Sequence, residues 1–185
     1  MIARYSVPMA RRQTLPLLWL LSDARNDASL EDALARLPQG SGFVFRHYHL
    51  ADAERRARFD GLAKVARGSG HRVILADSPE LVGAWGADGV YGASDRLGPA
   101  STLLRLATAH DGAEIQAAVA AGADGVFLSP VFPSRSHAQA TTLGVHGFHV
   151  LAQQSDVPVI ALGGMTHDRA RELDWPRWGA IDGLA

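Results

Sequence analysis

The feature that most constrains the fold is a series of eight short apolar runs that alternate with segments of helical pattern. The runs are nearly continuous rather than alternating, which is typical of parallel strands that are covered on both faces. They lie at residues 17–21, 42–46, 72–77, 89–92, 103–108, 125–132, 157–164 and 180–185. Helices are expected at 30–37, 52–67, 79–85, 113–121, 148–154 and 168–173, whereas 96–102 is too rich in glycine and proline for one.

A short repeat marks where helices pass into strands. Gly-Ala-Asp-Gly-Val at 86–90 recurs at 122–126, and loosely at 179–183. Glycine suits the end of a helix and Asp-Gly suits a tight turn, so each copy is expected to follow a helix and precede a strand. Eight strands joined in this way predict an α/β fold, a (β/α)8 TIM barrel. The barrel is a single domain over 17–185, with 1–16 as an N-terminal extension.

The competing fold is an open doubly wound sheet, which usually needs only five or six strands. The turn after the first run, at 22–26, has no Gly-x-Gly-x-x-Gly fingerprint, so a dinucleotide-binding fold is disfavoured.

Composition and charge exclude several functional classes. The chain has no cysteine, which rules out disulfides, thiolate zinc sites and a cysteine nucleophile. Its net charge is −1, so no broad nucleic-acid or membrane surface is expected. Arg11 and Arg12 precede an apolar run, as in a signal peptide, but Pro16 interrupts it and no cleavage site follows. We therefore expect a cytoplasmic protein that has no contact with membranes.

Loops after the carboxyl ends of barrel strands are expected to carry the function. Gly163-Gly164 follows the seventh run, where paired glycines either make a tight turn or let backbone N–H groups approach a phosphate. The sixth run leads into a proline-stiffened loop with hydroxyls, a guanidinium and an imidazole, a set suited to phosphate oxygens. Its polar residues are Ser129, Ser134, Arg135, Ser136 and His137.

Two other strand ends carry charge. Arg46 ends the second run and Tyr48 follows it; continued strand alternation would point these two to one side, and His47 and His49 to the other. Asp77 and Asp95 follow the third and fourth runs; together they suit Mg²⁺, although a lone Asp before Ser-Pro is more often a helix cap. His110, after the fifth run, gives no comparable signal, and neither do the other histidines.

The chain resembles the thiamine phosphate synthase and thiazole tautomerase superfamily over nearly its whole length. The resemblance lies in the order and spacing of Leu-Trp-Leu-Leu-Ser-Asp at 18–23, Ala-Asp-Gly-Val-Tyr-Gly at 87–92, Gly-Ala-Asp-Gly-Val at 122–126, Ser-Pro-Val-Phe-Pro-Ser at 129–134 and Pro-Val-Ile-Ala-Leu-Gly-Gly-Met at 158–165. It implies a (β/α)8 barrel and a reaction that joins hydroxymethylpyrimidine diphosphate to thiazole phosphate. Pyrophosphate would be released in that reaction, with Mg²⁺ as cofactor.

Carried over by position, the resemblance implies that Arg46 binds diphosphate and that Asp77 and Asp95 bind magnesium. Arg135, and His137 if protonated, are expected to complete the catalytic set with Arg46 in place of a lysine that the family carries. Substrate-binding residues are then expected at Tyr48, Ala76, Thr108, Ser134, Ser136, Gly163 and Gly164. The partners would be small phosphorylated molecules, and a homodimer is compatible with the sequence, which does not fix the oligomeric state.

Three departures from the family pattern keep other functions open. Tyr48 and His137 stand where synthases carry lysines, and Ala76 stands where they carry an asparagine. Lys64, the chain's single lysine, lies in an expected helix and cannot substitute. A synthase is the leading interpretation, and a non-catalytic phosphate-binding or regulatory protein is the alternative. A thiazole tautomerase is disfavoured, because Pro130 replaces the histidine of those enzymes.

Overall fold

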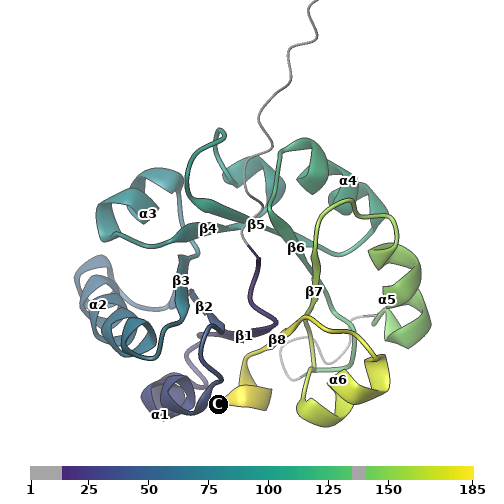
Figure 1. Cartoon of the computed structure of the whole chain (residues 1–185). Helices are drawn as coiled ribbons and strands as arrows, with labels where there is room; N and C mark the ends of the chain where they lie inside the picture. Colours follow the sequence, from purple (N-terminus) through teal and green to yellow (C-terminus); the bar gives the residue numbers. More distant parts are fainter. Residues whose placement is uncertain (1–13, 135–140) are drawn as a thin grey trace, which may run out of the picture.

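The computed structural model describes residues 14–134 and 141–185, and these form a closed barrel of eight parallel strands. Viewed along the barrel axis, the strands form an inner ring and the helices lie outside it (Figure 1). The strands are β1 (Leu18–Leu21), β2 (Gly42–Phe45), β3 (Arg72–Leu75), β4 (Gly89–Gly92), β5 (Leu104–Ala109), β6 (Gly125–Leu128), β7 (Val159–Ala161) and β8 (Trp178–Ala180). The predicted (β/α)8 fold is confirmed.

Six α-helices cover the strands: α1 (Leu30–Arg36), α2 (Asp52–Gly68), α3 (Pro79–Trp85), α4 (Gly112–Ala120), α5 (Gly144–Ala152) and α6 (His167–Leu173). Short 3-10 turns η1 (Asp27–Ser29), η2 (Ser94–Arg96) and η4 (Asp182–Leu184) complete the described elements. As expected from its glycine and proline content, the connection between β4 and β5 contains only η2. None of the described helices is both long and apolar enough to cross a membrane.

Closure of the ring depends on pairing between the first and last strands. Leu18, Trp19 and Leu20 of β1 pair with β8 on one side, and Trp19 also pairs with Gly42 of β2. The barrel interior is filled by large buried side chains, among them Trp19 and Phe127, whose rings meet edge to face at 5.5 Å. A filled interior leaves the strand ends as the place for a ligand.

The residues before β1 take part in this packing. Leu15 is buried in the interior cluster, and the carbonyl of Pro16 accepts a hydrogen bond from Trp19 Nε1 at 2.9 Å. The described end of the expected N-terminal extension therefore belongs to the barrel core.

The two strong copies of the repeat behave as expected at the helix ends. Gly86 and Gly122 have φ of +69° and +75°, the left-handed region that favours glycine. The aspartates do more than turn the chain, because Asp88 and Asp124 accept hydrogen bonds from the backbone N–H groups of Val73 and Arg105. Each aspartate lies just before one strand and thus links it to the start of the neighbouring strand.

The expectation for the chain's last segment was wrong. Residues 179–183 do not precede a strand, because β8 is Trp178–Ala180 and the chain then turns into η4. Gly183 lies so close to the backbone carbonyl of Met165 that a Cβ atom would collide with it. The segment therefore crosses the end of the barrel instead of continuing as a strand over 180–185.

Candidate active site

A cavity of about 800 Å³ opens at the carboxyl ends of the strands. It is lined by Asp23, Arg46, Tyr48, Tyr91, Thr108, His110, Ser129, Pro130, Pro133, Ser134, Leu162, Gly163, Gly164, Met165, Thr166, Arg169, Ala180, Ile181, Asp182 and Gly183. Six of the residues expected at the site are therefore brought together: Arg46, Tyr48, Thr108, Ser134, Gly163 and Gly164. Arg135, Ser136 and His137 lie outside the described residues.

Arg46 is held in place by the end of β1. Its Nε donates to the carbonyl of Ser22 at 2.9 Å, and its Nη2 donates to Asp23 Oδ2 at 2.8 Å. Its backbone N–H donates to Ser22 Oγ at 2.8 Å. The guanidinium is thus fixed on one wall of the cavity, and the chain's expected alternation is observed, since Tyr48 also lines the cavity and His47 does not.

Asp23 remains ionised beside this arginine. Partial burial opposes ionisation, but hydrogen bonds from Arg25 and the charges of Arg25 and Arg46 outweigh it and lower the pKa of Asp23. The cavity therefore presents a paired cation, which an anionic ligand must draw away from its carboxylate.

Tyr91 closes the floor of the cavity. Its ring packs edge to face on Phe127 at 5.2 Å, and burial raises the pKa of Tyr91 to about 12. The phenol is therefore protonated at neutral pH and can donate a hydrogen bond to a ligand in the cavity.

Asp77 does not line the cavity and is paired with a buried arginine. Arg55 Nη1 lies 2.5 Å from Asp77 Oδ2, while its Nε and Nη2 donate to the carbonyls of Arg46 and Ala76. The rings of Phe45, Tyr48 and Trp85 lie 5.4–5.7 Å from the guanidinium carbon. Arg55, which sequence reasoning did not single out, therefore joins the ends of β2 and β3.

Ala76, Asp77 and Asp95 are not among the residues that line the cavity. The methyl group of Ala76 packs in the barrel interior, and Asp95 is exposed on η2. Asp77 is not the cap of α3; Ser78 holds that place and accepts from the N–H of Leu81. Within the described chain, no three histidine, aspartate or glutamate side chains gather where they could hold a metal ion.

The opposite wall is built by Gly163 and Gly164, with φ of +94° and +63°. A Cβ on Gly163 would lie 2.7 Å from Pro130 Cα, and one on Gly164 would lie 2.5 Å from the carbonyl oxygen of Pro133. The paired glycines therefore let the loop after β7 pack directly against the loop after β6. In the described residues neither N–H donates to another backbone group, so both are available to a ligand.

Arg169 is the second arginine of the cavity and lies on this wall. Its Nη1 donates to the carbonyls of Gly164 at 2.5 Å and Pro133 at 3.3 Å, and its guanidinium lies over Phe132 at 5.2 Å. The Oγ1 of Thr166, also in the cavity lining, accepts from the N–H of Arg169 and caps α6. The two cavity arginines therefore stand on different walls, one at the end of β2 and one at the start of α6.

Sequence reasoning missed several lining residues, notably Asp23, Tyr91, His110 and Arg169. His110, which gave no comparable signal in the sequence, lines the cavity while its Nδ1 pairs with Glu114 at 2.8 Å. The signal for Arg169 was its place in the first turn of the helix after the Gly-Gly loop.

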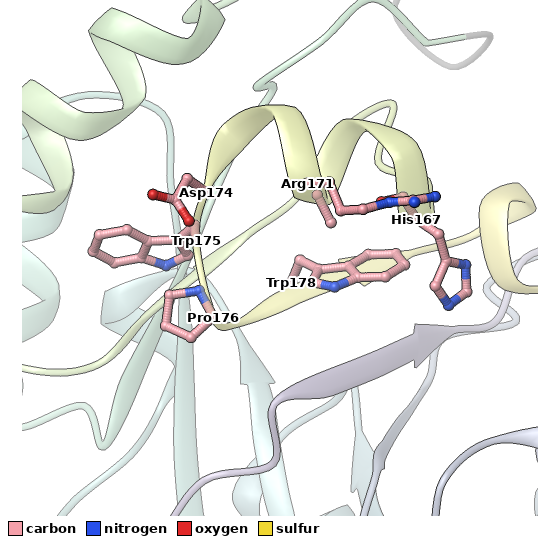
Figure 2. A pocket seen from close by; sticks show the side chains of 7 residues that line it. His167, Arg171, Asp174, Trp175, Pro176 and Trp178 are labelled. Atoms are coloured by element: carbon pink, nitrogen blue, oxygen red, sulfur yellow. The ribbon is translucent and has the colours of Figure 1, made fainter.

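A second hollow, of about 480 Å³, lies on the outside of the barrel between α6 and β8. Figure 2 shows the indole of Trp178 below α6, with His167 at one end and Trp175 and Pro176 at the other. The ring of His167 meets that of Trp178 edge to face at 5.1 Å. None of the expected site residues that the structure describes lines it, so the larger cavity is the candidate active site.

Known proteins resemble this chain over most of its described length. The family model of thiamine monophosphate synthase matches residues 18–175. Thiamine-phosphate synthase of Geobacillus thermodenitrificans is 27% identical over 175 residues, covering 88% of this chain and 79% of that protein. The corresponding protein of Salinibacter ruber is 28% identical over 181 residues, covering 90% and 78%. Other matches, such as the synthase of Methanoregula boonei at 33% identity, span only 54% of the relative's length.

Solved structures share the fold. Thiamine phosphate pyrophosphorylase from Pyrococcus furiosus superposes with a TM-score of 0.76 at 23% identity, covering 92% of this chain and 87% of that one. Because the family model spans most of the barrel, from β1 to the start of the last connection, the chain belongs to the thiamine monophosphate synthase family.

Proposed function

We propose that this protein is a thiamine-phosphate synthase, a transferase that joins hydroxymethylpyrimidine diphosphate to thiazole phosphate and releases pyrophosphate. The observation that carries the proposal is the placement of two arginines on different walls of one cavity. Two phosphorylated substrates that react with each other need two anion-binding regions in a shared space. The relatives named thiamine-phosphate synthase support the same reaction.

Arg46 is proposed to hold the diphosphate. It is an always-charged donor whose fork matches phosphate oxygens, and it lies at the rigid end of β2. Arg135 and His137, beyond the described part of the loop after β6, are proposed to approach the same group. The thiazole phosphate is proposed to lie at the other wall, on the N–H groups of Gly163 and Gly164 and near Arg169.

The chemistry requires stabilisation of a leaving anion more than a general base. The bond between the pyrimidine methylene carbon and the diphosphate oxygen breaks, and its electron pair leaves with the diphosphate. The thiazole nitrogen then donates its lone pair to the methylene cation. Thr108, Ser129 and Ser134 offer hydroxyl groups along the cavity to orient the two substrates.

Mg²⁺ is proposed as the cofactor; Asp95 and Asp77, which lie outside the lining of the cavity, are the carboxylates that would hold it together with substrate oxygens. Carboxylates are the hard ligands it prefers, and it commonly takes one or two of them plus phosphates and waters. Asp95 has no ion-pair partner among the described residues, whereas Asp77 retains only the lone pairs that Arg55 and the N–H of Ser78 leave open. When bound, the ion would neutralise charge on the leaving diphosphate.

One observation favours a second candidate, a protein that binds the phosphorylated thiazole without turnover. Arg46 is already paired with Asp23, and Tyr48 stands where the resemblance implies a lysine. The diphosphate wall of the described cavity is therefore weaker in cations than the family pattern.

Purified protein supplied with both substrates and Mg²⁺ distinguishes these candidates. A synthase forms thiamine phosphate, whereas a binding protein gives thiazole phosphate binding without product. The variant Arg46→Met, which keeps an unbranched apolar stem but removes the charge, should reduce product formation by about a hundredfold or more and leave thiazole phosphate binding intact.

A further inference from the structure

Three polar side chains form a chain of hydrogen bonds behind Arg46. Ser22 follows β1, His47 follows β2, and Asp27 begins η1. His47 Nδ1 lies 2.8 Å from Ser22 Oγ, and His47 Nε2 lies 2.7 Å from Asp27 Oδ1. Ser22 Oγ in turn accepts from the N–H of Arg46 at 2.8 Å. This series of hydrogen bonds thus begins at Arg46, the residue proposed to bind diphosphate, and ends at Asp27 on the molecular surface.

The direction of every hydrogen bond in this chain is fixed. Asp27 is ionised, because hydrogen bonds from His47 and Arg58 outweigh its partial burial and lower its pKa, so His47 Nε2 must donate to it. A neutral imidazole that donates from Nε2 accepts at Nδ1. Ser22 therefore donates its hydroxyl hydrogen to His47 and accepts from Arg46, which leaves no member unsatisfied.

The surroundings favour the neutral form of His47. Burial lowers its pKa below the ordinary value, and charge interactions with His49 and Arg58 act in the same direction, while Asp27 opposes them. The imidazole is 1% exposed and stacks on the ring of Phe45 at 4.7 Å. It is thus a rigid connector between two loops.

The backbone at His47 supports the same interpretation. Its φ is +39°, in the left-handed region that non-glycine residues seldom adopt. A residue keeps such a conformation only when its contacts hold it there. The contacts with Ser22, Asp27 and Phe45 provide that restraint, directly beside Arg46.

We propose that Ser22, His47 and Asp27 are positioning residues that hold Arg46 in the orientation needed to bind diphosphate. The proposal rests on the proposed function of Arg46. None of the three is among the residues that line the cavity. Each acts through the backbone and guanidinium of Arg46, for which Ser22 supplies two acceptors, its hydroxyl and its carbonyl oxygen.

The same three residue types form the nucleophilic triad of many hydrolases, but the arrangement here does not serve that chemistry. Ser22 is 0% exposed, so no substrate carbonyl can reach its Oγ. Its Oγ also already accepts the N–H of Arg46, which occupies one of its two lone pairs. Positioning is the role that remains.

Hydrogen exchange and pyrophosphate binding test this role on the full chain. Ser22→Ala should speed exchange of the Arg46 backbone N–H at least about tenfold, since a buried hydrogen bond is lost. It should also weaken binding of inorganic pyrophosphate, measured by titration calorimetry, by roughly tenfold. The double variant Ser22→Ala/Arg46→Met should bind pyrophosphate no more weakly than Arg46→Met alone, because both changes act on one interaction. Asp27→Ala, at the exposed end of the chain, should give a smaller effect in the same direction and replaces Ser22→Ala if that variant does not fold.

Two buried residues at the opposite end of the barrel serve as matched controls. Ser41 Oγ donates to the carbonyl of Pro38 at 2.6 Å just before β2, and His71 Nε2 contacts the carbonyl of Leu34 at 2.9 Å just before β3. Ser41→Ala and His71→Asn should leave pyrophosphate affinity unchanged, whereas His47→Asn should reduce it.

Unchanged exchange at residue 46 in Ser22→Ala, or additive losses in the double variant, would overturn the proposal. If Arg46→Met binds pyrophosphate as well as the natural protein does, the diphosphate site itself is wrong. The exchange measurement still judges the contact between Ser22 and Arg46 in that case, so the two failures are distinguishable.

Discussion

The guanidinium of Arg46 and the carboxylate of Asp23 are joined by a hydrogen bond of 2.8 Å between the loops that follow the neighbouring strands β2 and β1. The pair is partly exposed, so its net contribution to stability is small. Its consequence for binding is larger, because Asp23 both occupies a donor of Arg46 and repels an incoming diphosphate.

Replacement of Asp23 by asparagine should therefore strengthen diphosphate binding. We expect Asp23→Asn to lower the KM for the pyrimidine diphosphate by roughly two- to tenfold, since one repulsive charge is removed in a screened environment. Initial rates at varied substrate give the KM. Asp60→Asn, which removes the partner of Arg56 on the outer face of α2, is the control and should change nothing. A higher KM in Asp23→Asn would mean that the carboxylate aligns Arg46 rather than competing for it.

Arg169 should act on the other substrate. Arg169→Met is expected to raise the KM for thiazole phosphate by about tenfold, the usual worth of a charge-assisted hydrogen bond, and to leave the KM for the diphosphate unchanged. Arg171→Met lies two residues along the same helix and removes a guanidinium that pairs with exposed Asp168, so it should have no effect on either constant. Equal effects of both variants would assign the loss to α6 as a whole.

The Gly163-Gly164 turn should not tolerate a side chain. Gly163→Ala places a Cβ against Pro130 and forces an L residue to φ of +94°. We expect the free energy of unfolding to fall by at least about 2 kcal/mol, measured by denaturant titration. Gly61→Ala provides the contrast, since Gly61 lies within α2 with nothing within 4 Å of the added Cβ. That variant should gain up to about 1 kcal/mol.

The lowered pKa of His47 predicts how the stability of the fold changes with pH. Its pKa is lowered in the folded chain, so the unfolded chain binds the proton more readily. The contribution of His47 to stability is therefore complete above its unfolded pKa, about 6.5, and is lost as the pH falls through the lower folded value. Unfolding midpoints from pH 8 to pH 5 should fall less steeply in His47→Asn than in the natural protein, and equal slopes would contradict this assignment.

Much of the fold was predictable because it repeats. Eight apolar runs and two Gly-Ala-Asp-Gly-Val copies report on local structure, which depends on neighbours in sequence. The prediction was wrong at the last strand, since Trp-Gly-Ala at 178–180 is too short to be distinguished from a loop. Its strand conformation depends on pairing with Leu18, Trp19 and Leu20 at the far end of the sequence.

The candidate site was likewise predictable only in part. Arg46, Tyr48 and the Gly163-Gly164 pair closely follow the carboxyl ends of strands, where (β/α)8 barrels carry their active sites. The pairing of Arg46 with Asp23, of Arg55 with Asp77, and of His47 with Asp27 joins different loops. Such contacts depend on strand register and loop path, which residue types at a given spacing do not reveal.

The central claim is tested most directly by measuring both products of one reaction. With hydroxymethylpyrimidine diphosphate, thiazole phosphate and Mg²⁺, the purified protein should release thiamine phosphate and pyrophosphate in equal amounts. Arg46→Met should reduce that rate by about a hundredfold or more, since it removes the proposed partner of the leaving group. Folded natural protein that binds thiazole phosphate but forms neither product would contradict the account.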